Sequence, residues 1–70
     1  MSEIFELLEE ARIEKWLNKR KFSNECLGVT EDTYIARQHR FPRKPHKKTR
    51  TAICNLLNMT DEDLDLRLSH

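Results

Sequence analysis

The eight residues Leu27-Gly-Val-Thr-Glu-Asp-Thr-Tyr34 predict a corner between two helices. Gly28 is the only glycine in the chain, and it stands where a helix C-terminus often needs a left-handed residue. Thr30 follows as an N-cap, with two acids in the first turn of the next helix. Val29 and Tyr34 have the spacing of a hydrophobic staple. This stretch therefore predicts how the chain turns between the helices on either side of it.

The pattern of this corner recurs in type at Leu57-Asn-Met-Thr-Asp-Glu-Asp-Leu64. Asn58 replaces the glycine as the left-handed residue, and Thr60 takes the N-cap position. A last helix is expected over about 61–68, with its leucines at the fourth and eighth positions facing inward. Because the match covers only eight residues, it indicates a repeat of corner chemistry rather than a duplication.

The first helix is expected over about 3–20, with Ser2 as its N-cap. Its apolar residues divide between two faces. One face carries Ile4, Leu7, Leu8 and Ala11. The other carries Ile13, Trp16 and Leu17. Either the helix breaks near residue 11 or 12, or it lies between two surfaces. In the second case Ile13, Trp16 and Leu17 bind a partner chain, and a homodimer is one such arrangement.

Three further boundaries follow from local signals. Ser23 is read as the cap of a short second helix. The helix after the first corner is expected over about 31–40, because Pro42 disfavours helical angles at the residue before it. A further helix is expected to begin with Thr49 or Thr51 as its cap.

These elements predict one all-α domain over residues 1–70, made of four or five short helices with a basic extended arm in the middle. The arm covers 41–50 and contains both prolines, Pro42 and Pro45. It is expected to be extended, to be flexible, or to pair as a small hairpin that forms a wing. Seventy residues bury only one small core. With no catalytic motif visible, the sequence does not predict an enzyme.

Residues 37–50, here called the basic belt, hold seven of the thirteen Lys and Arg residues and no acid. The formal charges of the segments 1–36, 37–50 and 51–70 are −3, +7 and −3. Self-repulsion at this density is relieved by an anionic partner, either a nucleic acid or an acidic protein surface. The alternative is a solvated, flexible loop that binds nothing.

The first corner resembles a helix-turn-helix DNA-binding motif, on the residues Leu27-Gly-Val-Thr30 and Thr33-Tyr-Ile35. The following His39-Arg-Phe-Pro42 is similar to the exit of the recognition helix in excisionase-type winged variants, so the resemblance spans residues 23–50. Asn24 departs from the family pattern, which prefers a small residue there.

The resemblance implies that Thr33, Arg37 and Arg40 face the groove of duplex DNA from a recognition helix. Arg37 also departs from the pattern, which prefers an apolar anchor at its position. The phosphate contacts implied for the belt are Arg43, Lys44, Lys47, Lys48 and Arg50. The leading hypothesis is a small DNA-binding protein that regulates transcription. The alternative is an adaptor that binds a larger regulatory protein or enzyme.

Other classes of site have little support. Cys26, His39, His46 and Cys54 lack the close ligand pairs that make a zinc motif specific, so no metal or cofactor is expected. No apolar run reaches the roughly 18 residues of a membrane span. No export signal is visible, so the expected location is intracellular, in the cytoplasm or, in a eukaryote, the nucleus.

Overall fold

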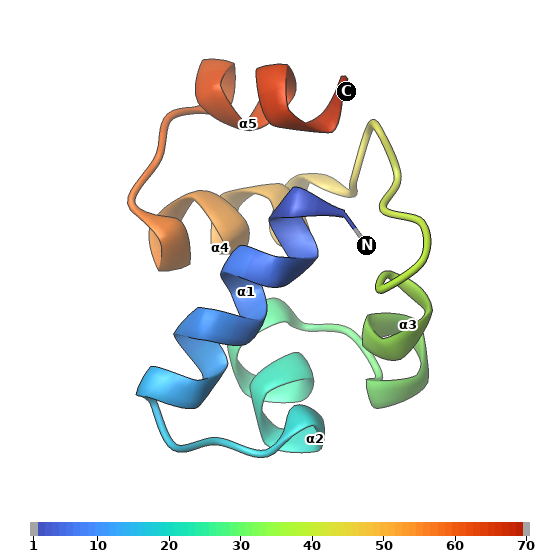
Figure 1. Cartoon of the computed structure of the whole chain (residues 1–70), viewed down its shortest axis with the longest axis vertical. Helices are drawn as coiled ribbons and strands as arrows, with labels where there is room; N and C mark the ends of the chain where they lie inside the picture. Colours follow the sequence, from blue (N-terminus) through green and yellow to red (C-terminus); the bar gives the residue numbers. More distant parts are fainter. Residues whose placement is uncertain (1, 70) are drawn as a thin grey trace.

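Residues 2–69, the part of the chain that the computed structural model describes, contain helices and no strand (Figure 1). The elements are α1 (Glu3–Glu14), α2 (Lys19–Lys21), η1 (Phe22–Leu27), α3 (Glu31–Ala36), α4 (Lys47–Leu57) and α5 (Asp61–Leu68). α2 runs directly into η1, a six-residue segment wound with the wider π-helix geometry. The expected all-α class is therefore confirmed.

The predicted caps and left-handed residues are present. The side chains of Ser2, Thr30 and Thr60 accept hydrogen bonds from the backbone N–H three residues on, at 3.1, 3.2 and 3.1 Å. Gly28 and Asn58 end their helices with φ of 69° and 53°. The last helix has the predicted bounds, 61–68. Local chemistry therefore determined both corners and the start of α1.

The end of α1 corrects the prediction of a helix to residue 20, because the helix stops at Glu14. Trp16 takes a left-handed conformation, with φ of 59°. Its N–H donates to the carbonyl of Ile13 at 3.0 Å, and the N–H of Leu17 donates to the carbonyl of Arg12 at 3.3 Å. This is the hydrogen-bond pattern of a Schellman helix end, with tryptophan in the place that glycine usually takes.

The next helix begins earlier than predicted. Asn18, not Ser23, is its cap, and its Oδ1 accepts from the N–H of Lys21 at 2.8 Å. Ser23 lies buried in the continuous α2–η1 helix, and its hydroxyl donates to the carbonyl of Arg20 at 3.0 Å. A serine can lie inside a helix when its hydroxyl donates to a carbonyl of the preceding turn. The prediction was wrong because it relied on the usual preference of serine for cap positions.

The prediction that α3 would reach residue 40 was also wrong, since it ends at Ala36. Past that point the chain tightens, and the N–H of Gln38 donates to the carbonyl of Ile35 at 3.0 Å, a bond spanning three residues instead of four. The chain then leaves the helix direction, and Phe41 packs against the core. Burial of that ring, together with the proline after it, accounts for the early end.

The segment between α3 and α4 forms no strand, so a hairpin wing is absent from the described residues. α4 begins at Lys47, so the last four belt residues are helical rather than extended. His46 is the cap in place of Thr49 or Thr51, and its Nδ1 accepts from the N–H of Lys48 at 3.4 Å. Thr49 and Thr51 lie within the helix.

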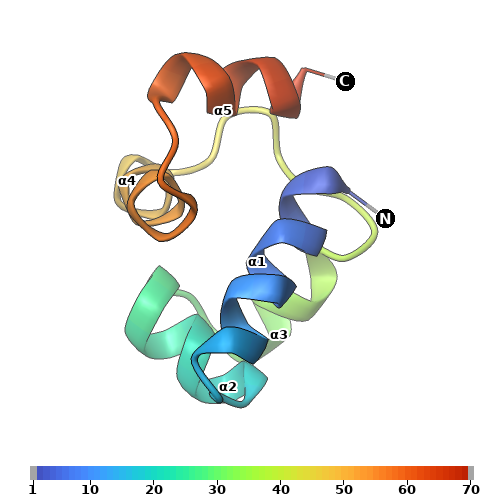
Figure 2. The same ribbon diagram turned by 60° about the vertical axis from the view of Figure 1, so that its left-hand side comes forward.

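The core gathers around α1, which packs against α4 and α5 (Figure 2). Its buried apolar members are Ile4, Phe5, Leu8, Phe22, Leu27, Tyr34, Ile53, Leu64 and Leu68. The Tyr34 ring joins three elements, with its centroid 5.0 Å from that of Phe5 on α1 and 5.6 Å from that of Phe22 on η1. Between α3 and α4 the belt runs outside this core (Figure 1).

Candidate functional site

The basic belt leaves the end of α3, passes along the outside of the molecule and finishes in the first turn of α4. Five of its seven cations have exposed side chains that are paired with no acid within residues 2–69. They are Arg40, Arg43, Lys44, Lys47 and Lys48. Their charge faces solvent, which is the condition for binding an anionic partner.

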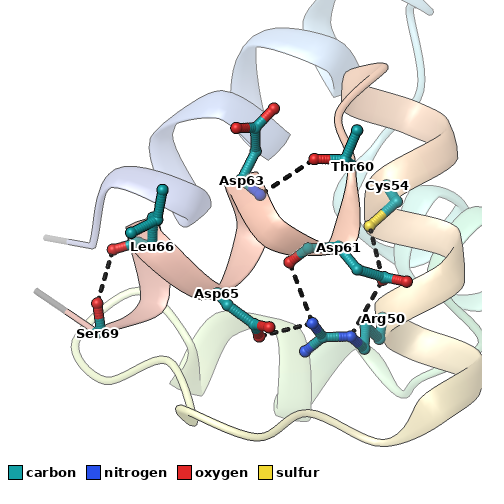
Figure 3. Close-up of polar contacts among 8 residues, drawn as sticks. All are labelled: Arg50, Cys54, Thr60, Asp61, Asp63, Asp65, Leu66 and Ser69. Atoms are coloured by element: carbon teal, nitrogen blue, oxygen red, sulfur yellow. Dashed lines mark hydrogen bonds and ion pairs between the residues drawn. The ribbon is translucent and has the colours of Figure 1, made fainter.

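The other two belt cations are engaged by the protein itself. Arg37 is half-buried, and its guanidinium carbon lies 5.8 Å from the centroid of the Phe41 ring, within the range of a cation–π contact. Arg50 is paired with Asp61 and Asp65 of α5 (Figure 3). The structure therefore divides the belt, which the sequence presents as seven equal charges, into an open part and an occupied part.

Arg50, Asp61 and Asp65, here called the Arg50 cluster, join α4 to α5. Arg50 Nε donates to Asp61 Oδ1 at 3.1 Å, and Nη2 donates to the Asp61 carbonyl at 3.1 Å and to Asp65 Oδ1 at 2.5 Å. The hydrogen bond to Asp65 raises the pKa of Arg50. The Cys54 thiol donates to Asp61 Oδ1 at 3.5 Å. Burial and this hydrogen bond raise the pKa of Cys54, which keeps the thiol protonated.

The expected recognition face does not form on one helix. Arg37 is the C-cap of α3 and Arg40 lies beyond it, because the helix ends at Ala36. The Thr33 hydroxyl accepts a hydrogen bond from the Thr30 hydroxyl at 2.8 Å, so it is part of the cap. The prediction of Thr33, Arg37 and Arg40 at successive turns of one helix was therefore wrong. The residues remain near one another along the chain, on a turn that leads into the belt.

The three residues assigned to a partner surface also separate. Ile13 is 63% exposed and Trp16 is 92% exposed, whereas Leu17 is half-buried and packs against the core. Because α1 ends at Glu14, Trp16 and Leu17 do not continue a helical face. Ile13 and Trp16 thus remain as exposed apolar side chains at the end of α1, and Leu17 belongs to the body of the domain.

A second polar cluster, which sequence reasoning missed, links α1 to α3. Glu9, Arg12 and Tyr34 form it, and it is called here the Glu9 cluster. The Tyr34 hydroxyl donates to Glu9 Oε2 at 2.6 Å, and Arg12 donates to both Glu9 oxygens at 2.8 and 3.1 Å. Arg12 Nη1 also donates to the carbonyl of Leu17 at 2.9 Å. The only signal in the sequence was the three-residue spacing of Glu9 and Arg12.

Burial and hydrogen bonding act in opposite directions on the pKa of Glu9. Burial works to raise it, but the hydrogen bonds from Arg12 and Tyr34 outweigh burial and lower it. For Tyr34 both effects have the same sign, so burial and the bond to the Glu9 carboxylate raise its pKa. The cluster therefore holds a charged carboxylate against a neutral phenol at neutral pH.

Within residues 2–69, no three His, Cys, Asp or Glu side chains gather as a metal site. None of the helices in that part of the chain is both long and apolar enough to cross a bilayer. The sequence matches no protein-family model, no curated protein and no solved structure. On chemical grounds the open part of the belt is the strongest candidate site.

Proposed function

We propose that the protein is a small DNA-binding regulatory protein whose basic belt contacts the backbone of duplex DNA. The observation that carries the proposal is the open part of the belt, whose five exposed cations have no acid partner within residues 2–69. Cations of this kind gain free energy on meeting phosphates, because they release the counterions condensed on the duplex.

The unit before the belt supports the same proposal. η1, the left-handed Gly28 and the capped α3 follow in the order that the helix-turn-helix resemblance implies. α3 has only six residues, and Glu31 and Asp32 in its first turn repel phosphate. Contacts of the belt with the backbone would therefore supply most of the affinity, and base readout by Arg37 at the end of α3 would add less.

The test measures the affinity for a generic duplex of about 20 base pairs by fluorescence anisotropy, from about 50 to 200 mM salt. We expect salt-sensitive binding by the wild-type protein. Replacing Lys44, Lys47 and Lys48 with glutamine should weaken binding at every salt concentration. It should also lower the slope of log K against log salt by roughly 2–3, since each phosphate contact contributes about 0.9.

A matched control changes three exposed cations outside the belt, Lys15, Arg20 and Lys21, to glutamine. It alters the net charge of the protein by the same amount, so it separates belt contacts from general attraction. Equal losses in the two triple variants, or no binding by the wild-type protein at about 50 mM salt, would contradict the proposal.

A second function, an adaptor that binds another protein, is favoured by one observation. Trp16 is 92% exposed and holds a left-handed backbone conformation that costs an L-residue roughly 1–2 kcal/mol. Ile13, which is 63% exposed, lies one turn before it. An exposed aromatic side chain on a strained backbone adds little to the stability of the free protein. Exposed aromatic residues are, however, frequent anchors of protein interfaces.

The adaptor function predicts a stoichiometric protein partner that co-purifies with the wild-type chain and is lost from the Trp16→Gly variant. Because Trp16 is the only tryptophan, its fluorescence should shift to shorter wavelength when the partner covers it. Gel filtration tests the homodimer directly, since a monomeric mass at high concentration excludes a second copy as the partner. If Trp16→Gly retains the partner, Trp16 is not part of the interface.

A further inference from the structure

The largest unused feature is a pair of hollows where the belt passes the ends of α1 and α5. The first has a volume of about 440 Å³ and is bounded by the N-terminal end of α1, residues 39–41 and the C-terminal end of α5. The second, about 620 Å³, adjoins it and shares Arg40, Phe41 and Leu68 with it. Three segments far apart in the sequence therefore meet at one concave surface.

Arginine dominates the charge of these hollows. Arg40 and Arg67 line the first hollow, and Arg40 and Arg43 line the second. Phe41 and Leu68 are the apolar residues that both linings share. Arg40 and Arg43 are exposed, and no acid within residues 2–69 pairs with either. Several arginines beside apolar side chains suit a tetrahedral oxyanion, because each guanidinium offers several N–H donors in a planar arrangement.

Glu3 is the acid that opposes this arrangement. It lines the first hollow and forms an ion pair with Arg67 between the start of α1 and the end of α5. Both side chains are partly exposed, so the pair is of the kind that contributes little to stability. A phosphate in the hollow can therefore replace Glu3 as the partner of Arg67 with little loss of folding stability.

We infer that the concave surface formed by the two adjoining hollows, which Arg40, Arg43 and Arg67 line between them, holds one phosphate group of the bound nucleic acid. This inference rests on the proposed function and extends it. It adds Arg67, a cation outside the belt, to the contacts, and it makes Glu3 a residue that weakens binding. The backbone would then run from the open part of the belt toward the end of α5.

Two single substitutions with opposite expected signs test the hollow. Arg67→Gln should weaken duplex binding roughly three- to tenfold and lower the salt slope by about one. Glu3→Gln should strengthen binding by a similar factor, because it releases Arg67 and removes a repulsive charge. Circular dichroism would confirm that both variants keep the helical content of the wild type.

Each substitution has a matched control. Lys15→Gln removes one cation at the opposite end of α1, and Glu6→Gln removes one acid from the same first turn as Glu3. Neither residue lines the two hollows. Both controls should bind duplex within about twofold of the wild type, since distant exposed charges are screened. If Arg67→Gln and Glu3→Gln change affinity no more than these controls, the inference is overturned and the belt proposal still stands.

A second probe is inorganic phosphate, followed by NMR of the backbone amides. The inference predicts saturable shifts at Arg40, Arg43 and Arg67 that Arg67→Gln abolishes. Shifts spread evenly over Lys44, Lys47 and Lys48 would contradict it. If phosphate saturates the hollow but the wild-type protein binds no duplex, the proposed function fails, and with it the nucleic acid as the source of the phosphate.

Discussion

The Glu9 cluster and the Arg50 cluster are built alike but differ in their exposure to solvent. α1 and α4 are each followed within two residues by a left-handed residue, Trp16 or Asn58, and in both an arginine of the helix binds a carboxylate. In the Glu9 cluster the carboxylate is only 21% exposed and also accepts from a buried tyrosine. In the Arg50 cluster the carboxylate of Asp61 is 72% exposed.

Ion pairs that look alike in composition therefore have different roles in this protein. A partly desolvated pair with a third hydrogen-bonded member stabilises the fold, since removing Glu9 takes away the carboxylate that both Arg12 and Tyr34 bind. In the Arg50 cluster the arginine is 22% exposed but both carboxylates are largely exposed, so water screens the pair and its contribution is small. We therefore expect the Glu9 cluster to hold the domain together, and the Arg50 cluster to be loose enough for an external anion to replace the carboxylates that Arg50 binds.

The largest expected effect comes from Glu9→Ala. It leaves the Tyr34 hydroxyl without an acceptor and the Arg12 guanidinium with only the Leu17 carbonyl, so we expect a loss of about 2–3 kcal/mol in the free energy of unfolding. Urea denaturation measures the change. Glu10→Ala, an exposed neighbour on the same helix, should stay within about 0.5 kcal/mol of the wild type. Equal effects of the two substitutions would abolish the distinction between the clusters.

The second effect is a loss of folding stability at alkaline pH. Because the chain has a single tyrosine, the ionisation of Tyr34 can be followed directly. Burial and the bond to Glu9 raise the pKa of Tyr34 above its ordinary value of 10.0. The stability supplied by the neutral phenol is therefore complete below pH 10 and is lost as the pH rises beyond it.

We expect the ultraviolet absorbance of the phenolate to appear only together with the loss of helical circular dichroism. The same chain unfolded in urea is the control and should titrate near pH 10. A phenolate signal near pH 10 in a fully helical protein would show that the Glu9 cluster is open to solvent.

The third effect is smaller and has the opposite sign. Trp16→Gly should be more stable than Trp16→Ala by about 1 kcal/mol, because glycine takes left-handed angles without the steric cost of a Cβ. Thermal and urea denaturation of the two variants measure the difference. If the glycine variant is no more stable than the alanine variant, the corner at Trp16 is not strained, and the argument for an interface there weakens.

The smallest effect is expected from Arg50→Gln. Its free energy of unfolding should differ from that of the wild type by no more than urea denaturation can resolve. Arg12→Gln, the equivalent change in the Glu9 cluster, should be clearly destabilising. The two variants together test whether the Glu9 cluster stabilises the fold more than the Arg50 cluster does. A large loss in Arg50→Gln would mean that the Arg50 cluster is structural and that Arg50 is not free to exchange partners.

Local signals predicted the parts of the fold that depend on local chemistry. The caps at Ser2, Thr30 and Thr60 and the left-handed Gly28 and Asn58 were all predicted, because each uses a residue type with a known preference. The end of α1 was not predicted, since tryptophan gives no sign of left-handed angles. The end of α3 was missed for a related reason, because the tightened turn after it brings Phe41 to a core built from distant segments.

The candidate site shows the same division. The belt and its charge were visible in the sequence, but the sequence did not indicate which of the belt cations would be paired with acids. Arg50 and Arg43 look alike in the chain, yet only Arg50 meets acids 11 and 15 residues away. The contribution of Arg67 to the hollow had no signal at all, since it depends on α5 lying beside the start of α1.

The amino-acid order by itself determined that this chain is helical, where two of its corners lie, and that its positive charge gathers between two acidic segments. Those properties follow from residues interacting with neighbours a few positions away. Three properties arise only from the packing of the helices: which charges lack an acid partner, which carboxylate is shielded, and the exposure of the one tryptophan. Those properties depend on contacts and burial between distant segments, which exist only once the core has assembled around α1.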